Sequence, residues 1–296
     1  MSNVAHDIDV EKVLKGIKIP SPPQVIADLQ MEMSMPDPDL KEMAKLISND
    51  AGLSGAVIKI ANSPYYTGNE KVTSISQAIL LLGMRTLMNI INTICIKNET
   101  LSTGLSDDTY ATLLRFWDSA TDVAKVCSMI ANKLNIVPHD YLYTLGLFHN
   151  VGITLMINKF DNYLEIMRQS YAQSEKRIVD VENDMLGTNH AVLGYYTAKS
   201  WKLDDHLCQI IAQHHNNLEF MEKQTDESQE LRDMAILKIA QHVAGVYRVL
   251  GGQDEDVRWD MIKDNVLLVA GLTNYELDEL IDQAKDSGIA QQQYFR

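Results

Sequence analysis

Leu142–Asn158, which reads LYTLGLFHNVGITLMIN, is the stretch from which the rest of the chain can be interpreted. It is strongly apolar and contains one polar pair, His149-Asn150, followed by Val151-Gly152. A histidine in the middle of a helix that faces a core either is satisfied by a neighbouring group or points at a metal ion, and the pair alone leaves both open. An aspartate after the histidine would add a carboxylate ligand for a divalent cation, whereas Asn150 is a neutral amide and a poor ligand. This asparagine is our main indication of what the protein does.

The length and composition are those of a soluble globular protein. The chain has 296 residues, of which 46% are hydrophobic and 22% are charged. A chain of this size can bury one large core or two modest ones. It carries 40 acidic against 26 basic residues, a net charge of −14. Nucleic acids and anionic membranes attract clustered basic surfaces, so we expect neither as a partner.

The cysteines and the N-terminus indicate the cellular compartment. The chain has three cysteines, Cys95, Cys127 and Cys208, which are widely spaced. An odd number at this spacing does not fit a disulfide framework and indicates a reducing compartment. The first residues, MSNVAHDIDVEK, contain acids and no apolar core, unlike a signal peptide. No run of 18 apolar residues follows them. We therefore expect a cytoplasmic protein.

Helical periodicity dominates the chain without a convincing alternating strand pattern, so the predicted fold class is all-α. In the first hundred residues, several helix starts carry residues that cap helix N-termini. These starts lie at Ser21-Pro22-Pro23, at Asp37-Pro38-Asp39 before Leu40–Ser48, at Asp50, and at Ser74 with Gln77 as a capping box. We expect the last of these helices to break at Gly83 and to continue to Asn98.

The segment Ala51–Ser54 has a second interpretation, as the turn of a helix-turn-helix with Val57 in the core. The would-be recognition helix offers a DNA groove only glycine, alanine and a lone Lys59. Residues 21–70 contain three basic and seven acidic side chains, which favours a buried helix pair over a DNA reader.

Residues 99–108, ETLSTGLSDD, are the best candidate for a boundary because they combine a glycine, hydroxyl side chains and acids without periodicity. We expect two packed helical lobes that meet there, the first over about 15–104 and the second from about 105, after an N-terminal segment 1–14. Residues 217–296 are expected to complete the second lobe. Its helices are predicted near 109–134, 142–158, 161–172, 175–186, 190–201, 204–216 and 231–250, followed by two acidic C-terminal helices.

Four histidines of the second half lie on three predicted helices. They are His149, His190, His214 and His215. Histidines that are dispersed in sequence can converge on one metal ion when their helices face a common core. The alternative is that each ring is simply half-buried, and both interpretations stay open.

Several segments together resemble a known family. These are IPSPPQVIADLQ, NDAGLSGAVIKIANSPYY, TSISQAILLLGMRTLMNII, LRFWDSATDVAKVCSMIA, YLYTLGLFHNVG and NHAVLGYYTAKSWKLDDHLCQIIAQHH, and they are similar to the HDOD domain. The resemblance covers roughly residues 15–216. It implies an all-helical bacterial signalling module related to HD-type phosphohydrolases, with a second lobe that is an HD-like helical bundle.

The resemblance also implies which positions correspond to the metal site of catalytic relatives. Those relatives use a histidine on the first helix of the HD lobe, a His-Asp pair, downstream histidines and a final aspartate. Binuclear relatives add a glutamate one turn before the first histidine. The corresponding positions here are Ser119, His149-Asn150, His190, His214-His215, Gln241 and Arg115. Each carboxylate is replaced, and one imidazole is a serine.

These replacements imply that hydrolysis by the HD mechanism is lost, because a divalent metal pair needs anionic ligands to offset its charge. We expect no cofactor, and four imidazoles could at most take adventitious zinc or nickel. The resemblance implies signal transduction or regulation, through a signalling protein in trans or a small ligand. Two alternatives stay open. One is a metal-dependent phosphohydrolase acting on a nucleotide or cyclic dinucleotide, and the other is a pocket that binds a nucleotide messenger through Arg85, Arg115 or Arg168. Surface ion pairing is the more common role for each of these arginines.

Overall fold

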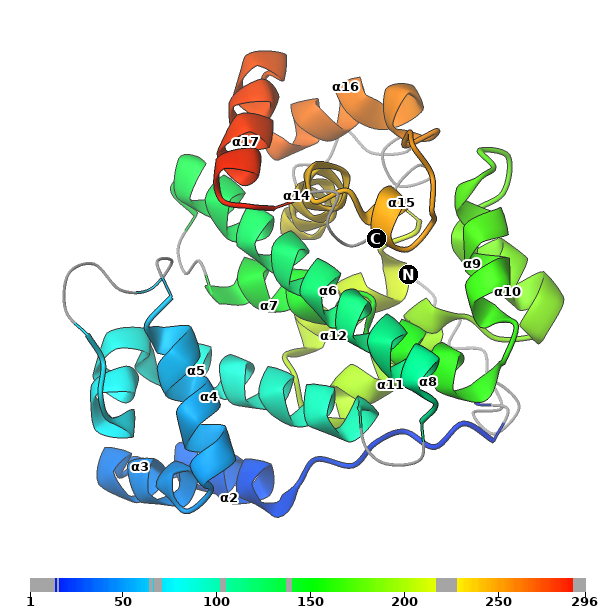
Figure 1. The fold of residues 1–296 in the computed structure, drawn as a ribbon. Helices are drawn as coiled ribbons and strands as arrows, with labels where there is room; N and C mark the ends of the chain where they lie inside the picture. The colour runs from blue at the N-terminus through cyan, green and yellow to red at the C-terminus, as the bar shows by residue number, and fades with distance from the viewer. Residues whose placement is uncertain are drawn as a thin grey trace, which may run out of the picture. The chain divides into compact units, whose positions relative to one another are not determined.

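The structure is a computed structural model that describes residues 14, 16–63, 66, 71–101, 105–136, 140–216 and 228–289. Within these residues every regular element is a helix (Figure 1). The predicted all-α fold class is therefore confirmed.

The chain divides into two compact units, Pro20–Thr103 and Gly104–Arg296 together with Met1–Ile19. The division falls inside residues 99–108, where the sequence loses its helical periodicity. Residues 16–19, which we assign to the first lobe from sequence, group instead with the second unit. How the two lobes pack against each other stays a prediction.

The unit Pro20–Thr103 is built from short helices and one long one. They are α2 (Gln24–Met33), α3 (Leu40–Ser48), α4 (Ala51–Ala61) and α5 (Ile75–Thr100). Three of these helices start where the sequence predicts, because Asp39, Asp50 and Ser74 each accept a backbone N–H of the following turn. The first starts after Pro23, which has no side chain that could accept such a bond.

The longest helix of this unit, α5, is kinked at Gly83, whose φ of 73° and ψ of 163° are not helical. Its start is not a reciprocal capping box, because Gln77 Oε1 accepts the N–H of Thr73 at 2.7 Å rather than that of Ser74. Among the described helices, α5 alone is long and apolar enough to cross a membrane by length and composition. However, 61% of its most apolar window is buried, as in a core helix of a soluble domain.

The neighbouring helices α3 and α4 are joined directly by Asn49-Asp50. Ala51–Ser54 forms the first turn of α4 rather than a turn between two helices, and Leu53 and Val57 are buried. This arrangement is the buried helix pair that the charge of the segment favours.

The second unit holds all the remaining described helices. They are α6 (Asp107–Lys133), α7 (Asp140–Phe148), α8 (Val151–Lys159), α9 (Tyr163–Tyr171), α10 (Ile178–Leu186), α11 (His190–Ser200), α12 (Asp205–Gln213), α14 (Gln229–Val243), α15 (Val246–Val249), α16 (Trp259–Ala270) and α17 (Asn274–Asp286). The long α6 packs against α7 and α14, and α11 packs against α8 and α12 (Figure 1). Phe116, Trp117, Phe148, Tyr163 and Trp201 are fully buried between these helices.

The central stretch Leu142–Asn158 forms two helices, not the single helix that we predict from sequence. Helix α7 ends at Phe148 and α8 begins at Val151, so His149 and Asn150 lie in the turn between them. This turn lets the start of α8 approach the backbone of α11. A Cβ at Gly152 would lie only 2.0 Å from the carbonyl oxygen of His190.

Two other predicted helices also differ from the structure. His214 and His215 follow the last residue of α12 instead of lying within it. The helix predicted over residues 231–250 breaks into α14 and α15 at Gly245, whose φ is 67°. Most of the polar connection 217–231 and of the tail 289–296 lies outside the described residues.

Candidate functional site

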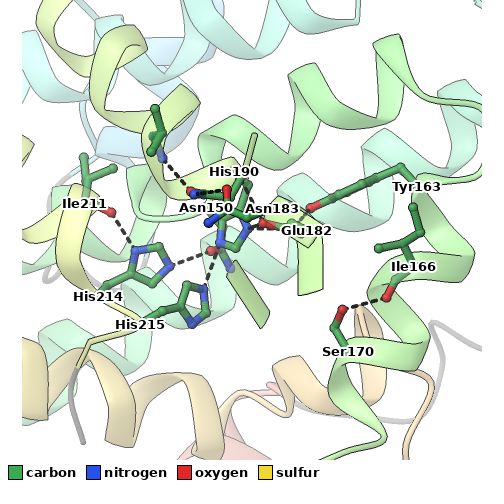
Figure 2. Close-up of polar contacts among 12 residues, drawn as sticks. Asn150, Tyr163, Ile166, Ser170, Glu182, Asn183, His190, Ile211, His214 and His215 are labelled. Carbon is green, nitrogen blue, oxygen red and sulfur yellow. Dashed lines mark hydrogen bonds and ion pairs between the residues drawn. The ribbon is translucent and has the colours of Figure 1, made fainter. Parts of the chain in front are cut away.

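The four histidines come together in the second unit. His149 lies in the turn before α8. His190 is the first residue of α11 and lies close to His214 and His215, which follow α12 (Figure 2). The ring centroids are 5.4 Å apart for His149 and His214 and for His190 and His214. They are 4.8 Å apart for His190 and His215 and 4.1 Å for His214 and His215. The rings therefore form one cluster, which we call the histidine cluster.

His149 is fixed by the helix that precedes it. Its Nδ1–H donates to the carbonyl oxygen of Gly146 at 2.7 Å. Burial lowers the pKa of His149 to about 3, so the ring is neutral and Nε2 carries a lone pair. This Nε2 is the one ring nitrogen of the cluster that is buried without a hydrogen-bond partner among the described residues.

His190 is held by a buried acid, Glu182, that the sequence did not single out. Both carboxyl oxygens of Glu182 lie 2.8 Å from His190 Nδ1, and one of them accepts the backbone N–H of His190 at 3.0 Å. The Tyr163 hydroxyl donates to the other oxygen at 2.5 Å. Glu182 therefore holds a proton on Nδ1 of His190 and orients the ring so that its Nε2 faces His215 (Figure 2).

His215 is hydrogen-bonded to His190. The two Nε2 atoms are 2.9 Å apart, so one of them donates its proton to the lone pair of the other. Burial, followed by the neighbouring rings of His214 and His190, holds the pKa of His215 well below its usual value. The His215 ring is thus neutral, and the Nε2 atoms of His190 and His215 are bonded to each other rather than open to a metal ion.

The amide of Asn150 satisfies His214 in a similar way. His214 Nδ1–H donates to the carbonyl oxygen of Ile211 at 2.7 Å, and burial holds the pKa of His214 well below its usual value. The Nε2 of this neutral ring is therefore an acceptor, and Asn150 Oδ1 lies 3.0 Å from it. An amide oxygen would repel the lone pair, so we assign the N–H₂ group of Asn150 to the position that faces the ring. An ionised aspartate could not donate this bond.

The donor set of the histidine cluster does not fit a hydrolytic metal centre. In the described part of the chain, one group of His, Cys, Asp or Glu ligand atoms lies within 4.8 Å of one another, and it consists of His190, His214 and His215. The group contains no carboxylate, whereas hard divalent cations prefer oxygen ligands. Imidazoles alone suit zinc or nickel, and such an ion would have to displace the two hydrogen bonds just described.

The other predicted site positions lie on α6 and α14. Ser119 is buried on α6. Gln241 is buried on α14, where it lines a cavity of about 30 Å³ with His215 and Lys238. Arg115 is exposed and lines a different cavity, to which none of the four histidines contributes. The structure therefore places Gln241 beside the cluster and Arg115 at a separate surface.

A sequence signal for Glu182 does exist in α10. Ile178, Val179 and Val181 are buried in this helix, and Glu182 follows Ile178 by one turn, so it falls on the apolar face. A lone acid on such a face requires a buried hydrogen-bonding partner. Which partner it finds depends on the path of the chain between α10 and His190, and the sequence pattern does not define that path.

Comparison with known proteins identifies the family. A family model of the HDOD domain matches residues 19–217. An uncharacterized protein of Treponema pallidum (strain Nichols) is 26% identical over 203 residues, which are 67% of this chain and 38% of that protein. The uncharacterized protein YuxH of Bacillus subtilis (strain 168) is 26% identical over 128 residues, 43% of this chain and 30% of that protein. The chain thus covers less than half the length of either curated relative.

Solved structures share the fold at low sequence identity. An HDOD domain protein with unknown function from Geobacter sulfurreducens has a TM-score of 0.66 at 22% identity over 95% of both chains. A Shewanella amazonensis SB2B protein, named as a candidate phosphohydrolase, has a TM-score of 0.65 at 21% identity over 97% of both chains. A Marinobacter aquaeolei VT8 protein, named as a candidate signal transduction protein, has a TM-score of 0.59 at 17% identity over 93% of this chain and 59% of that one. Because the family model spans most of the chain and the fold agrees, this chain belongs to the HDOD domain family.

Proposed function

We propose that the protein is a signal-transduction or regulatory module that binds a signalling protein in trans or a small ligand and does not hydrolyse phosphate esters. The observation that carries this proposal is the internal hydrogen bonding of the histidine cluster. The Nε2 atoms of His190 and His215 lie 2.9 Å apart, and Nε2 of His214 lies 3.0 Å from the side-chain amide of Asn150. Two of the lone pairs that a metal ion would need are therefore used within the protein.

The charges of the replaced positions support the same proposal. Where catalytic relatives carry carboxylates, this chain carries Arg115, Asn150 and Gln241, none of which is anionic. A catalytic metal must be held in fixed geometry by ligands that offset its charge. We propose that the fold keeps its HD-like packing without the metal chemistry. We also propose that the protein works in the cytoplasm without nucleic acid or membrane partners, in keeping with its net charge of −14.

The alternative is a metal-dependent phosphohydrolase acting on a nucleotide or cyclic dinucleotide. Two observations favour it: His149 Nε2 is buried without a partner, and three other histidines lie within ligand distance of one another. The structural relative named as a candidate phosphohydrolase shares the fold alone, at 21% identity. The missing carboxylate ligands favour the binding module.

Restoring the lost ligands tests the proposal. In a Ser119→His/Asn150→Asp/Gln241→Asp variant, two new carboxylates are costly to desolvate, and the one at position 150 meets the lone pair of His214. Without metal, the variant should unfold at a lower temperature than wild type. Manganese or iron should then stabilise it by mass action, by about 2.7 kcal/mol at a hundredfold excess over the Kd. Wild type should gain nothing from either metal.

Asn183→Asp is the matched control for Asn150→Asp, because it makes the same substitution at an exposed position of α10. Asn183 Oδ1 accepts from Asn189 Nδ2 at 2.9 Å, and a carboxylate can accept the same bond. We expect this variant to melt close to wild type and to ignore both metals. Wild type stabilised by manganese as strongly as the triple variant would contradict the proposal. A triple variant that gains nothing would show that the three positions do not face one site.

A further inference from the structure

A second cavity lies in the same unit as the histidine cluster. It has a volume of about 280 Å³ and is bordered by residues of α6, α8, α9 and α15. Much of its lining is apolar, including Phe116, Ile157, Leu164 and Met167. This volume is close to the lower end of the range for pockets that hold small molecules, and such pockets combine an apolar wall with a few polar groups.

Two guanidinium groups supply the polar part of this lining, those of Arg115 on α6 and Arg168 on α9. Arg115 Nη2 donates to Thr112 Oγ1 at 3.1 Å, which orients the guanidinium along α6. Among the described residues that line the cavity, none is acidic. In the described part of the chain, neither guanidinium lies within ion-pairing distance of a carboxylate.

Acidic residues outnumber basic residues in this chain, 40 to 26, so two arginines without a described acidic partner at one cavity are unexpected. Elsewhere in the same unit an arginine does find an acid: Arg177 donates to both carboxylate oxygens of Asp180 at 2.8 Å. Guanidinium groups bind carboxylates and phosphates through such paired N–H donors. Arg177 uses its guanidinium N–H groups to bind the carboxylate of Asp180. The guanidinium N–H groups of Arg115 and Arg168 have no such carboxylate partner among the described residues at the cavity.

We propose that this cavity binds a small anionic ligand with an apolar or aromatic body, whose phosphate or carboxylate group is held by Arg115 and Arg168. The body lies against the wall that contains Phe116, Ile157 and Leu164. The ligand is smaller than a cyclic dinucleotide, since the cavity has a volume of about 280 Å³. This inference gives a place and a chemical class to the small-ligand part of the proposed function and rests on it.

The test uses two fluorescent probes with related bodies and different charge. 1-Anilinonaphthalene-8-sulfonate carries one anionic group on an aromatic body, and N-phenyl-1-naphthylamine is the same body without the sulfonate. The 296-residue chain should bind one molecule of the anionic probe, and more tightly than the neutral one. Because both arginines are near the surface, the affinity for the anionic probe should fall as salt is added.

Variants of the lining separate the charge from the apolar wall. Arg115→Gln and Arg168→Gln should each weaken the anionic probe by about tenfold, the lower end for a charge-assisted hydrogen bond, and leave the neutral probe unchanged. Leu164→Trp should fill the cavity and weaken both probes. Arg85→Gln is the matched control, since Arg85 lies in the other unit and does not line the cavity. It should bind both probes like wild type.

Competition with the anionic probe shows whether the cavity takes a phosphate ester or a carboxylate. Adenosine monophosphate should displace the anionic probe if the site takes a phosphate ester, and decanoate should displace it if the site takes a carboxylate. The proposal is overturned if neither competes, if the arginine variants bind like wild type, or if Arg85→Gln loses as much affinity as they do. None of these results depends on turnover, so they are distinguishable from a failure of the proposed non-hydrolytic function.

Discussion

Gly152→Ala is expected to lower the free energy of unfolding by about 3 kcal/mol, near the upper end for an overpacked site. The added Cβ would lie 2.0 Å from the carbonyl oxygen of His190 and 2.7 Å from the backbone N of Gly194. Both are backbone atoms, so α8 and α11 must move apart. Alanine has a higher helix propensity than glycine, but that gain of about 1 kcal/mol is smaller than the packing cost. Urea unfolding followed by circular dichroism measures the difference.

Gly55→Ala is the matched control for this substitution. Gly55 lies within α4, and a Cβ there would meet no atom within 4 Å. The helix propensity of alanine should then act alone and stabilise the protein by roughly 0.5–1 kcal/mol. Equal effects of the two substitutions would mean that the approach of Gly152 to His190 is not close, and the geometry of the histidine cluster would be wrong.

Glu182→Ala should lower the free energy of unfolding by about 4 kcal/mol. The substitution leaves three buried donors without their acceptor: the Tyr163 hydroxyl, the backbone N–H of His190 and its ring Nδ1–H. Each unsatisfied buried donor costs about 1–3 kcal/mol. The ring of His190 also loses the group that fixes its tautomer, so nitrogen chemical shifts of its imidazole should show a mixture of tautomers.

Tyr163→Phe removes one of these bonds and keeps the ring, so it serves as the graded control. It should cost about 1 kcal/mol and leave the tautomer of His190 unchanged, because the two contacts from Glu182 to His190 Nδ1 remain. If Glu182→Ala is no more destabilising than Tyr163→Phe, Glu182 does not organise the histidine cluster.

The parts of the fold that depend on local chemistry were predictable from sequence. Asp39, Asp50 and Ser74 start helices because each side chain bonds to a backbone N–H only two or three residues further on. Gly83 kinks α5 because it adopts a positive φ at little cost. The four histidines could be selected as one candidate group from their type, their helical context and the resemblance to the HDOD domain.

The details of the site were not predictable because they depend on contacts between distant segments. The turn at His149-Asn150 accompanies the close approach of Gly152 to His190, which lies 38 residues further along the sequence, and no local pattern encodes it. The hydrogen bonds of the cluster depend on which ring nitrogen each distant neighbour engages. Arg115 was assigned to the metal site from resemblance alone, whereas the structure places it at another cavity with Arg168.

The central claim is that the histidine cluster carries out no hydrolysis, and a turnover assay tests it most directly. Purified protein is incubated with an aryl phosphate and with a cyclic dinucleotide, with manganese, iron or nickel added in turn. We predict no metal-dependent turnover in wild type, and therefore no difference from His149→Ala, which removes the unpartnered Nε2. Metal-dependent turnover in wild type that disappears in His149→Ala would contradict the claim and establish the phosphohydrolase instead.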